Sequence, residues 1–547
     1  MIYSLNMGSL ASKVYEHKYA MVKEDGTKET WPETAQRVAQ HVCRPYLPDL
    51  VDPVADRITA RQLLPAGRYL YAAGRKYHQV NNCALLKAYD SRVGWADLVQ
   101  RITNMLMTGM GVGIVYSDVR PSGSGVRGMG GQASGPCALM QMVNECGRHI
   151  MQGGSRRSAI WAGLHWNHAD VFQFIHLKDW PEWMAQAKRT DFNAAAVMDG
   201  TNISVILDDA FFHAFHSPRH RDHGLARRVY REVIEQMVRT GEPGFSIDVG
   251  EHAGEHLRNA CTEVTSTTDN DICNLASLNL ARFEDINDFA DAVEEATAFL
   301  ICGTLYSDLP TKELKKVREQ NRRLGLGLMG FHEWLLRRGK VYGPDEELGQ
   351  WLQVYEDVSR ATADSLSDRL SISRPVACRA IAPTGTIAII AETTSGIEPI
   401  FAVAFKRRYL KGNTWHAQYV IDSAAQRLID DGIDPDRIED AYSLASDPSR
   451  RLAFQAFVQG FVDQGISSTL NLPAWGSPDN NPDKVDEFSF HLFDHLPLLR
   501  GMTAYPDGAR DGQPLTPVPY HEAVFRQGVE VLEYGNEVAC PSGVCGI

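Results

Sequence analysis

A regular alternation of short apolar runs with longer amphipathic stretches constrains the fold of this chain more than any other feature. From Asn81 to about Tyr505, glycine-rich turns separate the two kinds of segment. The apolar runs predict short buried strands, and they lie at 107–119, 201–207, 273–280 and 378–392. The amphipathic stretches predict helices, for example at 225–241 and 356–370. Strands that alternate with helices favour an α/β fold with much parallel sheet.

The alternation divides the chain into three regions. Residues 1–75 mix charged and apolar positions at helical spacing and predict a helical N-terminal region. Residues 76–510 carry the strand–helix alternation and predict the α/β domain. Residues 511–547 end in the small, polar, glycine-containing segment EVACPSGVCGI, which is typical of a mobile tail.

Composition excludes several classes of protein. The net charge is -13, so the chain lacks the general attraction to phosphate that nucleic-acid-binding proteins have. No stretch reaches the roughly 18 uninterrupted apolar residues that a membrane span needs, and the first residues lack the pattern of a signal peptide. Ten cysteines in 547 residues are too few for a disulfide scaffold. We therefore expect a cytoplasmic protein whose partners include neither nucleic acid nor a membrane.

Cys540 and Cys545 lie at the very end of the chain, separated by Pro-Ser-Gly-Val. A mobile terminus is a poor place to bury cysteines, and two thiols that can close across a turn suit thiol–disulfide exchange with another group. Half of a metal site is the alternative, but no second cysteine or histidine pair lies nearby to complete four ligands.

The segment RNACTEV places Asn259, Cys261 and Glu263 at alternate positions. On extended backbone such positions project to the same face, so an amide, a thiol and a carboxylate would converge. Burial raises the pKa of a carboxyl group and suits it to proton transfer. By itself the triplet fits a surface strand with alternating polar residues equally well.

Two further motifs are ambiguous when each is taken alone. Cys83 and Cys273 each begin an apolar run after polar residues, which is typical of a buried structural cysteine. Pro383-Thr384-Gly385-Thr386 is a glycine-containing turn with two hydroxyls, and its N–H and O–H donors could hold a phosphate. A helix cap by either threonine explains the same turn equally well.

Taken together, these segments resemble the catalytic subunit of ribonucleotide reductases. NACTEV followed by ICNLASLNL resembles the finger-loop region of that family, and the terminal cysteine pair resembles its shuttling tail. The likeness runs from about residue 60 to the end of the chain, in the family's order. It continues in GMGVGIVYSDVRPSGSGVRGMGGQASGP, GGSRRSAI, NISV, RRLGLGLMGF and APTGTIAIIAETTSGIEPIF. The resemblance implies a ten-stranded α/β barrel of two antiparallel halves, with the finger loop threading its centre.

The resemblance also implies roles in the reduction of a ribonucleotide substrate. Cys261 would hold a thiyl radical and take hydrogen from C3′ of the ribose. Glu263 would remove the proton of the 3′-hydroxyl, and Asn259 would hydrogen-bond the sugar. Cys83 would protonate the departing 2′-hydroxyl and then form a disulfide with Cys273.

The remaining site residues are implied in the same way. Cys540 and Cys545 would reduce the inner disulfide and be reset by a thioredoxin- or glutaredoxin-like reductant. Ser134 and Gly135, together with residues 383–386, would bind the phosphate groups of the substrate. The loops that sense a deoxynucleotide effector would contain Val126, Arg127, Ser155, Arg156 and Arg157. Without the resemblance, the two adjacent arginines are simply a solvated charge pair. His165 and His168 have the spacing of a metal pair, but they match a family segment with no ligand role, so we expect no metal.

Members of this family differ in how the cysteine radical is made. Oxygen-dependent members receive it from a separate metal-containing subunit through two adjacent tyrosines, whereas cobalamin-dependent members cleave adenosylcobalamin above the cysteine. Here Thr503-Ala504 stands in place of the tyrosine pair, and TAYPDGAR resembles the cobalamin type. We therefore expect a ribonucleotide reductase that uses adenosylcobalamin.

Three alternatives and some details stay open. The chain could be an oxygen-dependent catalytic subunit that binds no cofactor and receives its radical from a partner subunit, with Tyr505 as the relay in a variant register. More remotely, it could be a non-enzymatic redox or metal-binding protein, or a nucleotide-binding regulator without turnover. The sequence does not decide between a diphosphate and a triphosphate substrate, or between a monomer and a homodimer.

Overall fold

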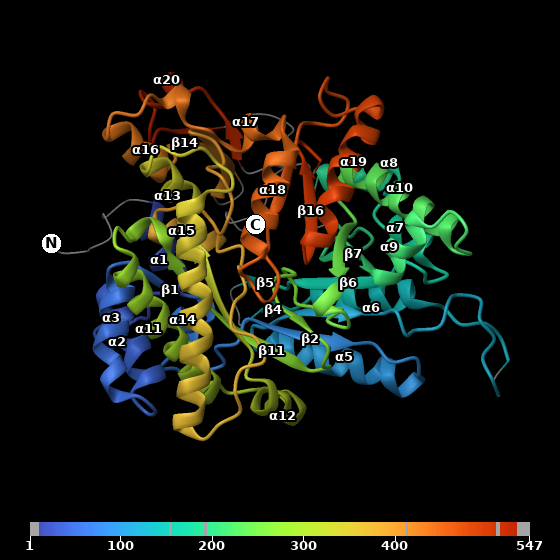
Figure 1. Ribbon diagram of the computed structural model, residues 1–547, viewed down its shortest axis with the longest axis horizontal. Coiled ribbons are helices and arrows are strands. Elements are labelled where there is room, and N and C mark those ends of the chain that lie inside the picture. Colours follow the sequence, from blue (N-terminus) through green and yellow to red (C-terminus); the bar gives the residue numbers. More distant parts are fainter. Residues whose placement is uncertain are drawn as a thin grey trace.

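A large mixed sheet, surrounded by helices, organises the protein (Figure 1). The computed structural model describes residues 10–128, 130–152, 156–190, 194–411, 414–509 and 515–532. Ten strands belong to the main sheet, in the order β1-β11-β2-β3-β6-β7-β8-β16-β15, with β12 paired to β11.

Five parallel strands form the first half of this sheet. They are β2 (Cys83–Lys87), β3 (Gly111–Val115), β6 (Ile160–His165), β7 (Thr201–Asp208) and β8 (Gly244–Asp248). Nearly all their residues are buried, because helices cover the outer face and other side chains fill the inner one. This double burial explains why the sequence shows them as continuous apolar runs.

The second half runs antiparallel to the first. It contains β11 (Asp271–Asn279), β12 (Leu324–Met329), β15 (Thr469–Leu472) and β16 (Gly501–Pro506), with parallel pairs β11–β12 and β15–β16. The two halves meet at two antiparallel seams, β11 with β2 and β16 with β8. The short strand β1 (Leu63–Pro65) pairs antiparallel with β11 beyond the end of β2.

The α/β class and the antiparallel relation of two strand sets agree with the sequence analysis. The hydrogen-bonded ladder is not continuous around the whole sheet in the described residues, so the closed barrel stays a prediction. Between β12 and β15 the connection consists of two isolated parallel bridges, Leu326 to Arg379 and Ile381 to Ile466.

Helices connect the parallel strands, as parallel pairing requires. In the first half these are α5 (Arg92–Met107), α6 (Pro136–Arg148), α7 (Val171–Ile175), α8 (Glu182–Thr190), α9 (Asp209–His216) and α10 (His223–Thr240). In the second half they are α11 (Ile286–Tyr306), α12 (Lys312–Asn321), α13 (Phe331–Arg337), α14 (Glu346–Leu370), α15 (Gly385–Ala391), α18 (Pro448–Gln459) and α19 (Val485–His495). None of the helices described here is long and apolar enough to cross a membrane.

The N-terminal region is mainly helical. It contains α1 (Leu10–Lys18), α2 (Trp31–Cys43), α3 (Val51–Thr59) and α4 (Gly67–Ala72). Helices α2 and α3 pack against α11, and the three lie together at the lower left of Figure 1. Their buried side chains belong to the same hydrophobic cluster as those of β11, β12 and α14. The region therefore continues the core of the second half of the sheet.

A separate four-stranded antiparallel sheet was not foreseen. It has the order β17 (Leu515–Pro517), β13 (Ala404–Lys411), β14 (Thr414–Ile421), β18 (Glu530–Leu532). Helices α16 (Ser423–Asp430), α17 (Ala441–Ala445) and α20 (Tyr520–Ala523) lie at the same end of the molecule (Figure 1). The Gly412-Asn413 dipeptide between two runs of β-forming residues was the available signal in the sequence.

Candidate active site

A hairpin between the two strand sets carries the residues of RNACTEV. Strands β9 (Leu257–Arg258) and β10 (Thr265–Ser266) pair antiparallel and enclose the loop 259–264, called the finger loop from here on. The N–H of Asn259 donates to the carbonyl oxygen of Val264 at 3.3 Å, and the N–H of Val264 donates to Oδ1 of Asn259 at 3.0 Å. The Asn259 side chain thus closes the loop by accepting a hydrogen bond from the backbone of Val264.

The extended backbone expected for the triplet is wrong. The N–H of Thr262 donates to the carbonyl oxygen of Asn259 at 3.1 Å, and Thr262 has φ +68°. Residues 259–264 therefore form a turn, and the alternation argument does not apply to them. The physical reason is local: an asparagine side chain competes for backbone hydrogen bonds and favours a turn over a strand.

The finger loop lies against the inner face of the sheet. Strand β9 contacts β2, β3 and β6. Leu257 and Val264 belong to a small hydrophobic cluster that also contains inward side chains such as Leu85 of β2, Trp161 of β6 and Leu275 of β11. The neighbouring positions of β2, Ala84 and Leu86, instead belong to the cluster under the outer helices. Because strand side chains alternate between faces, the first cluster marks the interior.

Glycines from both strand sets give the finger loop its room. A Cβ at Gly113 of β3 would collide with the carbonyl oxygen of Arg258. On the opposite side, the N–H of Gly465 donates to the carbonyl oxygen of Glu263 at 2.7 Å, and a Cβ there would lie 2.8 Å from the carbonyl oxygen of Thr262. The loop is therefore held at the level of its backbone from two sides.

This close approach leads to a prediction about stability. Gly113→Ala should lower the free energy of unfolding by about 1–3 kcal/mol, because the new methyl group meets backbone that cannot rotate away. Thermal unfolding followed by circular dichroism measures the change. Gly224→Ala is the matched control, since a Cβ there has nothing within 4 Å. Equal melting temperatures for the two variants would contradict the tight fit.

Burial differs sharply along the finger loop. Asn259 and Glu263 are 0% and 1% exposed, whereas Cys261 at the tip is only partly buried. Within the described residues, Nδ2 of Asn259 is buried without a hydrogen-bond partner. An unmet buried N–H costs free energy, so this amide is a donor that a ligand can satisfy. The loop thus presents an accessible thiol beside a buried amide and a buried carboxylate.

Cys83 and Cys273 lie opposite each other at the seam between the strand sets. They are Cα partners in the antiparallel pair of β2 with β11, and both are thiols. Antiparallel partners have Cα atoms about 4.5–5.5 Å apart, which falls within the span of about 4.4–6.8 Å that a disulfide bridges. A pair of strands far apart in sequence therefore brings these two thiols to disulfide range.

Two glycines flank this cysteine pair. A Cβ at Gly111 of β3 would lie 3.2 Å from Sγ of Cys83 and 3.0 Å from Cβ of Ala260 in the finger loop. A Cβ at Gly325 of β12 would lie 2.9 Å from Sγ of Cys273. The sulfur atoms thus occupy space that side chains on the neighbouring strands would fill, next to the finger loop.

The electrostatic surroundings of Cys273 have opposing parts. Burial raises the pKa of this thiol well above its usual range, and the nearby charge of Arg323 lowers it. The carboxylates of Glu263 and Asp271 and the thiol of Cys83 act in the raising direction. Cys273 therefore rests as a neutral thiol, with one cation placed to favour its ionised form.

The segment 465–467 connects the Pro383–Thr386 turn to the finger loop by backbone hydrogen bonds. Ile381 exchanges backbone hydrogen bonds with Gly465 and Ser467 at 3.2 and 2.8 Å. Helix α15 begins at Gly385, and its N-cap Thr384 has φ +48°. The Thr384 side chain does not cap that helix but accepts from the N–H of Gly396 at 2.9 Å. The helix-cap alternative for Thr384 is thereby corrected, because its hydroxyl is used across the loop.

The other expected loop residues are spread over the first half of the sheet. Gly135 is buried at the start of α6 with φ +78°, and Ser134 before it is exposed. Val126 donates from its N–H to the carbonyl oxygen of Gly131 at 3.2 Å in the loop that also holds Arg127. Arg156 and Arg157 form the short strand β5, which pairs with β4 (Met151–Gln152). Ser155, Cys540 and Cys545 lie outside the described residues.

The two histidines with metal-like spacing bind protein groups. Nε2 of His165 lies 3.1 Å from Oδ2 of Asp208, and its Nδ1 lies 2.7 Å from Oδ1 of Asn167. Nε2 of His168 lies 2.8 Å from the carbonyl oxygen of Val119, and its Nδ1 accepts from the N–H of Asp170. These partners give both rings a structural role at the ends of β6 and β7.

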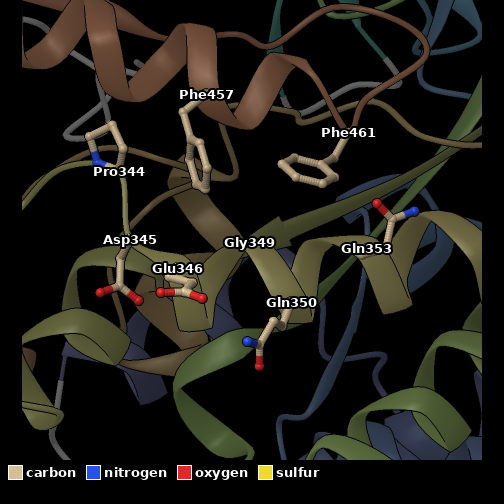
Figure 2. A pocket seen from close by; sticks show the side chains of 8 residues that line it. All are labelled: Pro344, Asp345, Glu346, Gly349, Gln350, Gln353, Phe457 and Phe461. Atoms are coloured by element: carbon tan, nitrogen blue, oxygen red, sulfur yellow. The ribbon is translucent and has the colours of Figure 1, made fainter.

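A surface hollow of about 540 Å³ lies away from the finger loop. It is formed by α14 and the end of α18, where the Phe457 and Phe461 rings stand over Gly349 (Figure 2). None of the residues that line it belongs to the cysteine stations or to the Pro383–Thr386 turn. The chemistry of the finger loop, and not the size of a surface hollow, therefore defines the candidate site.

Sequence reasoning missed the charged pair beside Cys273. Arg323 and Asp271 are 2.9 Å apart and almost fully buried, although they are 52 positions apart in the chain. Arg323 lies in RRLGLGLMGF, a segment that contributes to the family resemblance but gives no sign of a role for this arginine. No local pattern identifies its partner, because the contact depends on the pairing of β11 with β12.

Comparison with known proteins gives a consistent picture. The family described as ribonucleotide reductase, barrel domain, matches residues 81–224, 221–366 and 373–493. A vitamin B12-dependent ribonucleoside-diphosphate reductase of Mycobacterium tuberculosis (strain CDC 1551 / Oshkosh) is 27% identical over 94% of this chain and 81% of its own length. One from Thermoplasma acidophilum is 26% identical over 89% and 71%. A putative adenosylcobalamin-dependent ribonucleoside-triphosphate reductase of Mycobacterium phage D29 is 26% identical over 99% of both chains.

Proposed function

The chain belongs to the ribonucleotide reductase family, and we propose that it reduces ribonucleotides to deoxyribonucleotides with adenosylcobalamin as its cofactor. One observation carries the proposal: the finger loop that bears Cys261 lies, at Ala260, beside two further cysteines that face each other at disulfide range. Radical reduction of a sugar needs one thiol that cycles and a second pair that supplies two electrons. The arrangement offers both, since the finger loop with Cys261 lies beside the strands that carry Cys83 and Cys273.

The barrel of ten strands in two antiparallel halves follows as a proposal about the fold. Strands β2, β3, β6, β7 and β8 would face a second set made of β11, β12, the segment at 379–381, β15 and β16. The bridges from Leu326 to Arg379 and from Ile381 to Ile466 support this closure. On this arrangement residues 76–510 are the catalytic barrel, 1–75 a helical N-terminal region and 511–547 a C-terminal segment with a redox-active tail.

The finger loop would carry the radical step. Cys261 takes the hydrogen atom from C3′ of the ribose and later returns it. Glu263 accepts the proton of the 3′-hydroxyl, and its near-complete burial disfavours the charged carboxylate, which makes Glu263 a better proton acceptor. Nδ2 of Asn259, which is buried without a partner among the described residues, donates to the sugar.

The cysteine pair at the seam would supply the electrons. Cys83 donates a proton to the 2′-hydroxyl, which leaves as water. Cys83 and Cys273 then form a disulfide, so that two electrons and two protons pass from the pair to the sugar. Their position as strand partners supports this step, because little backbone movement is needed to bring the sulfur atoms together.

The cofactor fits the finger loop in one respect that the structure allows to be tested. The tip of the loop, at Cys261 and Thr262, is partly exposed whereas Asn259 and Glu263 are buried, so the tip is the part of the loop that a cofactor would approach. Strand β16 runs past the loop and would border that face, since a Cβ at Gly501 would lie 3.6 Å from Oγ1 of Thr262. When bound, adenosylcobalamin supplies the radical through cleavage of its cobalt–carbon bond.

Two positions of strand β16, Thr503 and Ala504, do not suit a relay through adjacent tyrosines, although Tyr505 lies on the same strand. Oγ1 of Thr503 donates to the carbonyl oxygen of Ser468 at 3.0 Å, and Ala504 is 3% exposed. Neither side chain can be oxidised as a tyrosine can. A relay of adjacent phenols from a partner subunit would be interrupted at these two positions.

Phosphate binding, specificity and regeneration complete the proposal. Ser134, Gly135 and the Pro383–Thr386 turn would hold the phosphate groups of a ribonucleoside diphosphate or triphosphate. The loops with Val126 and Arg127, and with Ser155, Arg156 and Arg157, would sense a deoxynucleotide effector, in a monomer or a homodimer. Cys540 and Cys545 would exchange with the inner disulfide and be reduced by a thioredoxin- or glutaredoxin-like protein.

Turnover of the purified chain tests the proposed function. With adenosylcobalamin, a ribonucleoside diphosphate or triphosphate and dithiothreitol, the chain should form deoxyribonucleotide without any metal-containing partner. Hydroxocobalamin, which lacks the adenosyl group, is the matched control and should give no product. A chain that is inert with adenosylcobalamin but active with a ferritin-like partner subunit would overturn the cofactor assignment and leave the reductase assignment intact.

A further inference from the structure

A buried cation lies beside the cysteine pair. The side chain of Arg323 is 4% exposed, and its Nε donates to Oδ2 of Asp271 at 2.9 Å. Its Nη2 donates to Oγ of Ser266 in β10 at 3.3 Å, and its Nη1 donates to Oε1 of Gln464 at 3.4 Å. Arg323 therefore connects strand β11, the base of the finger loop at Ser266 and the segment that contains Gln464. The next residue in that segment, Gly465, donates its N–H to the carbonyl oxygen of Glu263.

The strand register places Arg323 on the same face as the reacting sulfur. In the parallel pair of β11 with β12, Asn274 is the partner of Leu324 and Leu275 is the partner of Gly325. Asp271 and Cys273 are two residues apart on β11, so they share a face, and Arg323 and Gly325 do the same along the neighbouring strand. A Cβ at Gly325 would lie 2.9 Å from Sγ of Cys273, so the two strands present these two pairs of residues on the same face of the sheet.

The charged and titratable groups around Cys273 come from its own strand and from three neighbouring segments. Glu263 faces it from the finger loop, Asp271 from its own strand and Cys83 from β2, and all three raise its pKa after the larger effect of burial. The positive charge of Arg323 acts in the opposite direction and lowers the pKa of Cys273. Asp271 does not cancel the cation fully, because it also accepts from Asn321 and Ser266.

We infer that Arg323 is a positioning residue of the reductive half-reaction, whose guanidinium holds the base of the finger loop and stabilises the negative charge that develops on Cys273 when its disulfide with Cys83 is reduced. The inference rests on the proposed pairing of Cys83 with Cys273. It adds a residue that takes no part in the radical step.

The step is a thiol–disulfide exchange with a dithiol as the reductant. One thiolate of the dithiol attacks Sγ of Cys83, which at 7% exposed is the more accessible of the two sulfurs. A sulfur–sulfur bond forms to Cys83, the bond between Cys83 and Cys273 breaks, and its electron pair passes to Cys273. The Cys273 thiolate then takes a proton, and the second thiol of the dithiol releases Cys83 and closes the oxidised dithiol.

The experiment measures reduction of this disulfide directly. The full chain with Cys540→Ser and Cys545→Ser, so that the tail cannot exchange, is oxidised with diamide, and peptide mapping by mass spectrometry locates the disulfide. Dithiothreitol then reduces it under pseudo-first-order conditions at one fixed pH. Rate and equilibrium constants are measured for this parent protein and for three variants of it. The variants are Arg323→Lys, Arg323→Gln and the double variant Arg323→Gln with Asp271→Asn.

The inference predicts an order of rates. Arg323→Lys should stay near the parent, because it keeps the charge, and Arg323→Gln should be at least about tenfold slower, the factor that one unit of pKa represents. The double variant should lie between them, since it removes the opposing carboxylate as well. The equilibrium constant should not change, because both thiols are protonated after reduction and the cation then has no charge to stabilise.

Several outcomes would overturn the inference. Equal rates in all folded variants, or a double variant that recovers the full parent rate, would mean that the ion pair is only structural. A shift of the equilibrium constant in parallel with the rate would mean the same. If mapping finds no Cys83–Cys273 disulfide in the parent, the pairing in the proposed function fails together with this inference. Circular dichroism identifies any variant that does not fold, and the remaining variants still decide the order.

Discussion

Cys261→Ala should abolish deoxyribonucleotide formation, with a loss of at least about 10⁴-fold in kcat, because it removes the group that is proposed to carry the radical. Alanine has no sulfur to carry a radical, and neither neighbour at the tip of the finger loop can replace it. The side chain is partly exposed and its methylene is retained, so the melting temperature should hardly change. Single-turnover assays with dithiothreitol measure the loss without involving the tail.

A matched variant separates this effect from general damage. Cys146 in α6 is also partly buried and lies outside the finger loop, so Cys146→Ala should keep the parent activity. Cys261→Ser gives a second comparison, because an oxygen–hydrogen bond is too strong to take part in the exchange. Residual turnover of Cys261→Ala above one part in a hundred would rule out a thiyl radical at this position.

Glu263→Gln should lower kcat by about 10²–10⁴-fold, the usual contribution of a positioned proton acceptor. The amide is nearly the same size and can still hydrogen-bond, but it cannot accept the proton of the 3′-hydroxyl. KM should change much less than kcat, because the substitution leaves the cysteine pair and the turn that is proposed to bind phosphate in place. Steady-state kinetics with the small dithiol give both constants.

Two comparison variants give this prediction its controls. Glu263→Asp keeps the carboxylate on a shorter side chain and should recover part of the activity. Glu295→Gln makes the same chemical change at a carboxylate that binds Arg57, in the helical region that α2, α3 and α11 share. It should be fully active. A Glu263→Gln enzyme within threefold of the parent would assign the proton transfer to another group.

Most element types could be predicted from the sequence because their signals are local. The apolar runs at 107–119, 201–207 and 273–280 overlap β3, β7 and β11, and the amphipathic stretches at 225–241 and 356–370 overlap α10 and α14. The strand prediction at 378–392 is wrong for residues 385–391, which form helix α15, because a short apolar run fits a buried helix as well as a strand. Strand burial on both faces produces continuous apolar runs, and helix burial on one face produces a period of 3.6 residues. Both patterns arise from a residue's near neighbours, so they are visible without knowing the fold.

The candidate site was predicted less evenly. The finger-loop triplet, the inner cysteines and the Pro383–Thr386 turn were all identified, but the reason given for the triplet was wrong. Asn259, Cys261 and Glu263 lie on a turn closed by the Asn259 side chain, not on alternating positions of a strand. Gly113, Gly465 and Arg323 were missed, because their importance comes from what lies opposite them.

The sequence by itself determined most of the strands and helices of the main sheet, and which thiols and carboxylates are available for chemistry. Only the tertiary structure decided that Cys83 faces Cys273, that Arg323 pairs with Asp271 and that Gly113 admits the backbone of Arg258. The physical reason is that a strand's pattern specifies its faces but not its neighbours. Neighbours and register are fixed when all the apolar faces are buried together, and a shift of one residue would turn each side chain to the opposite face.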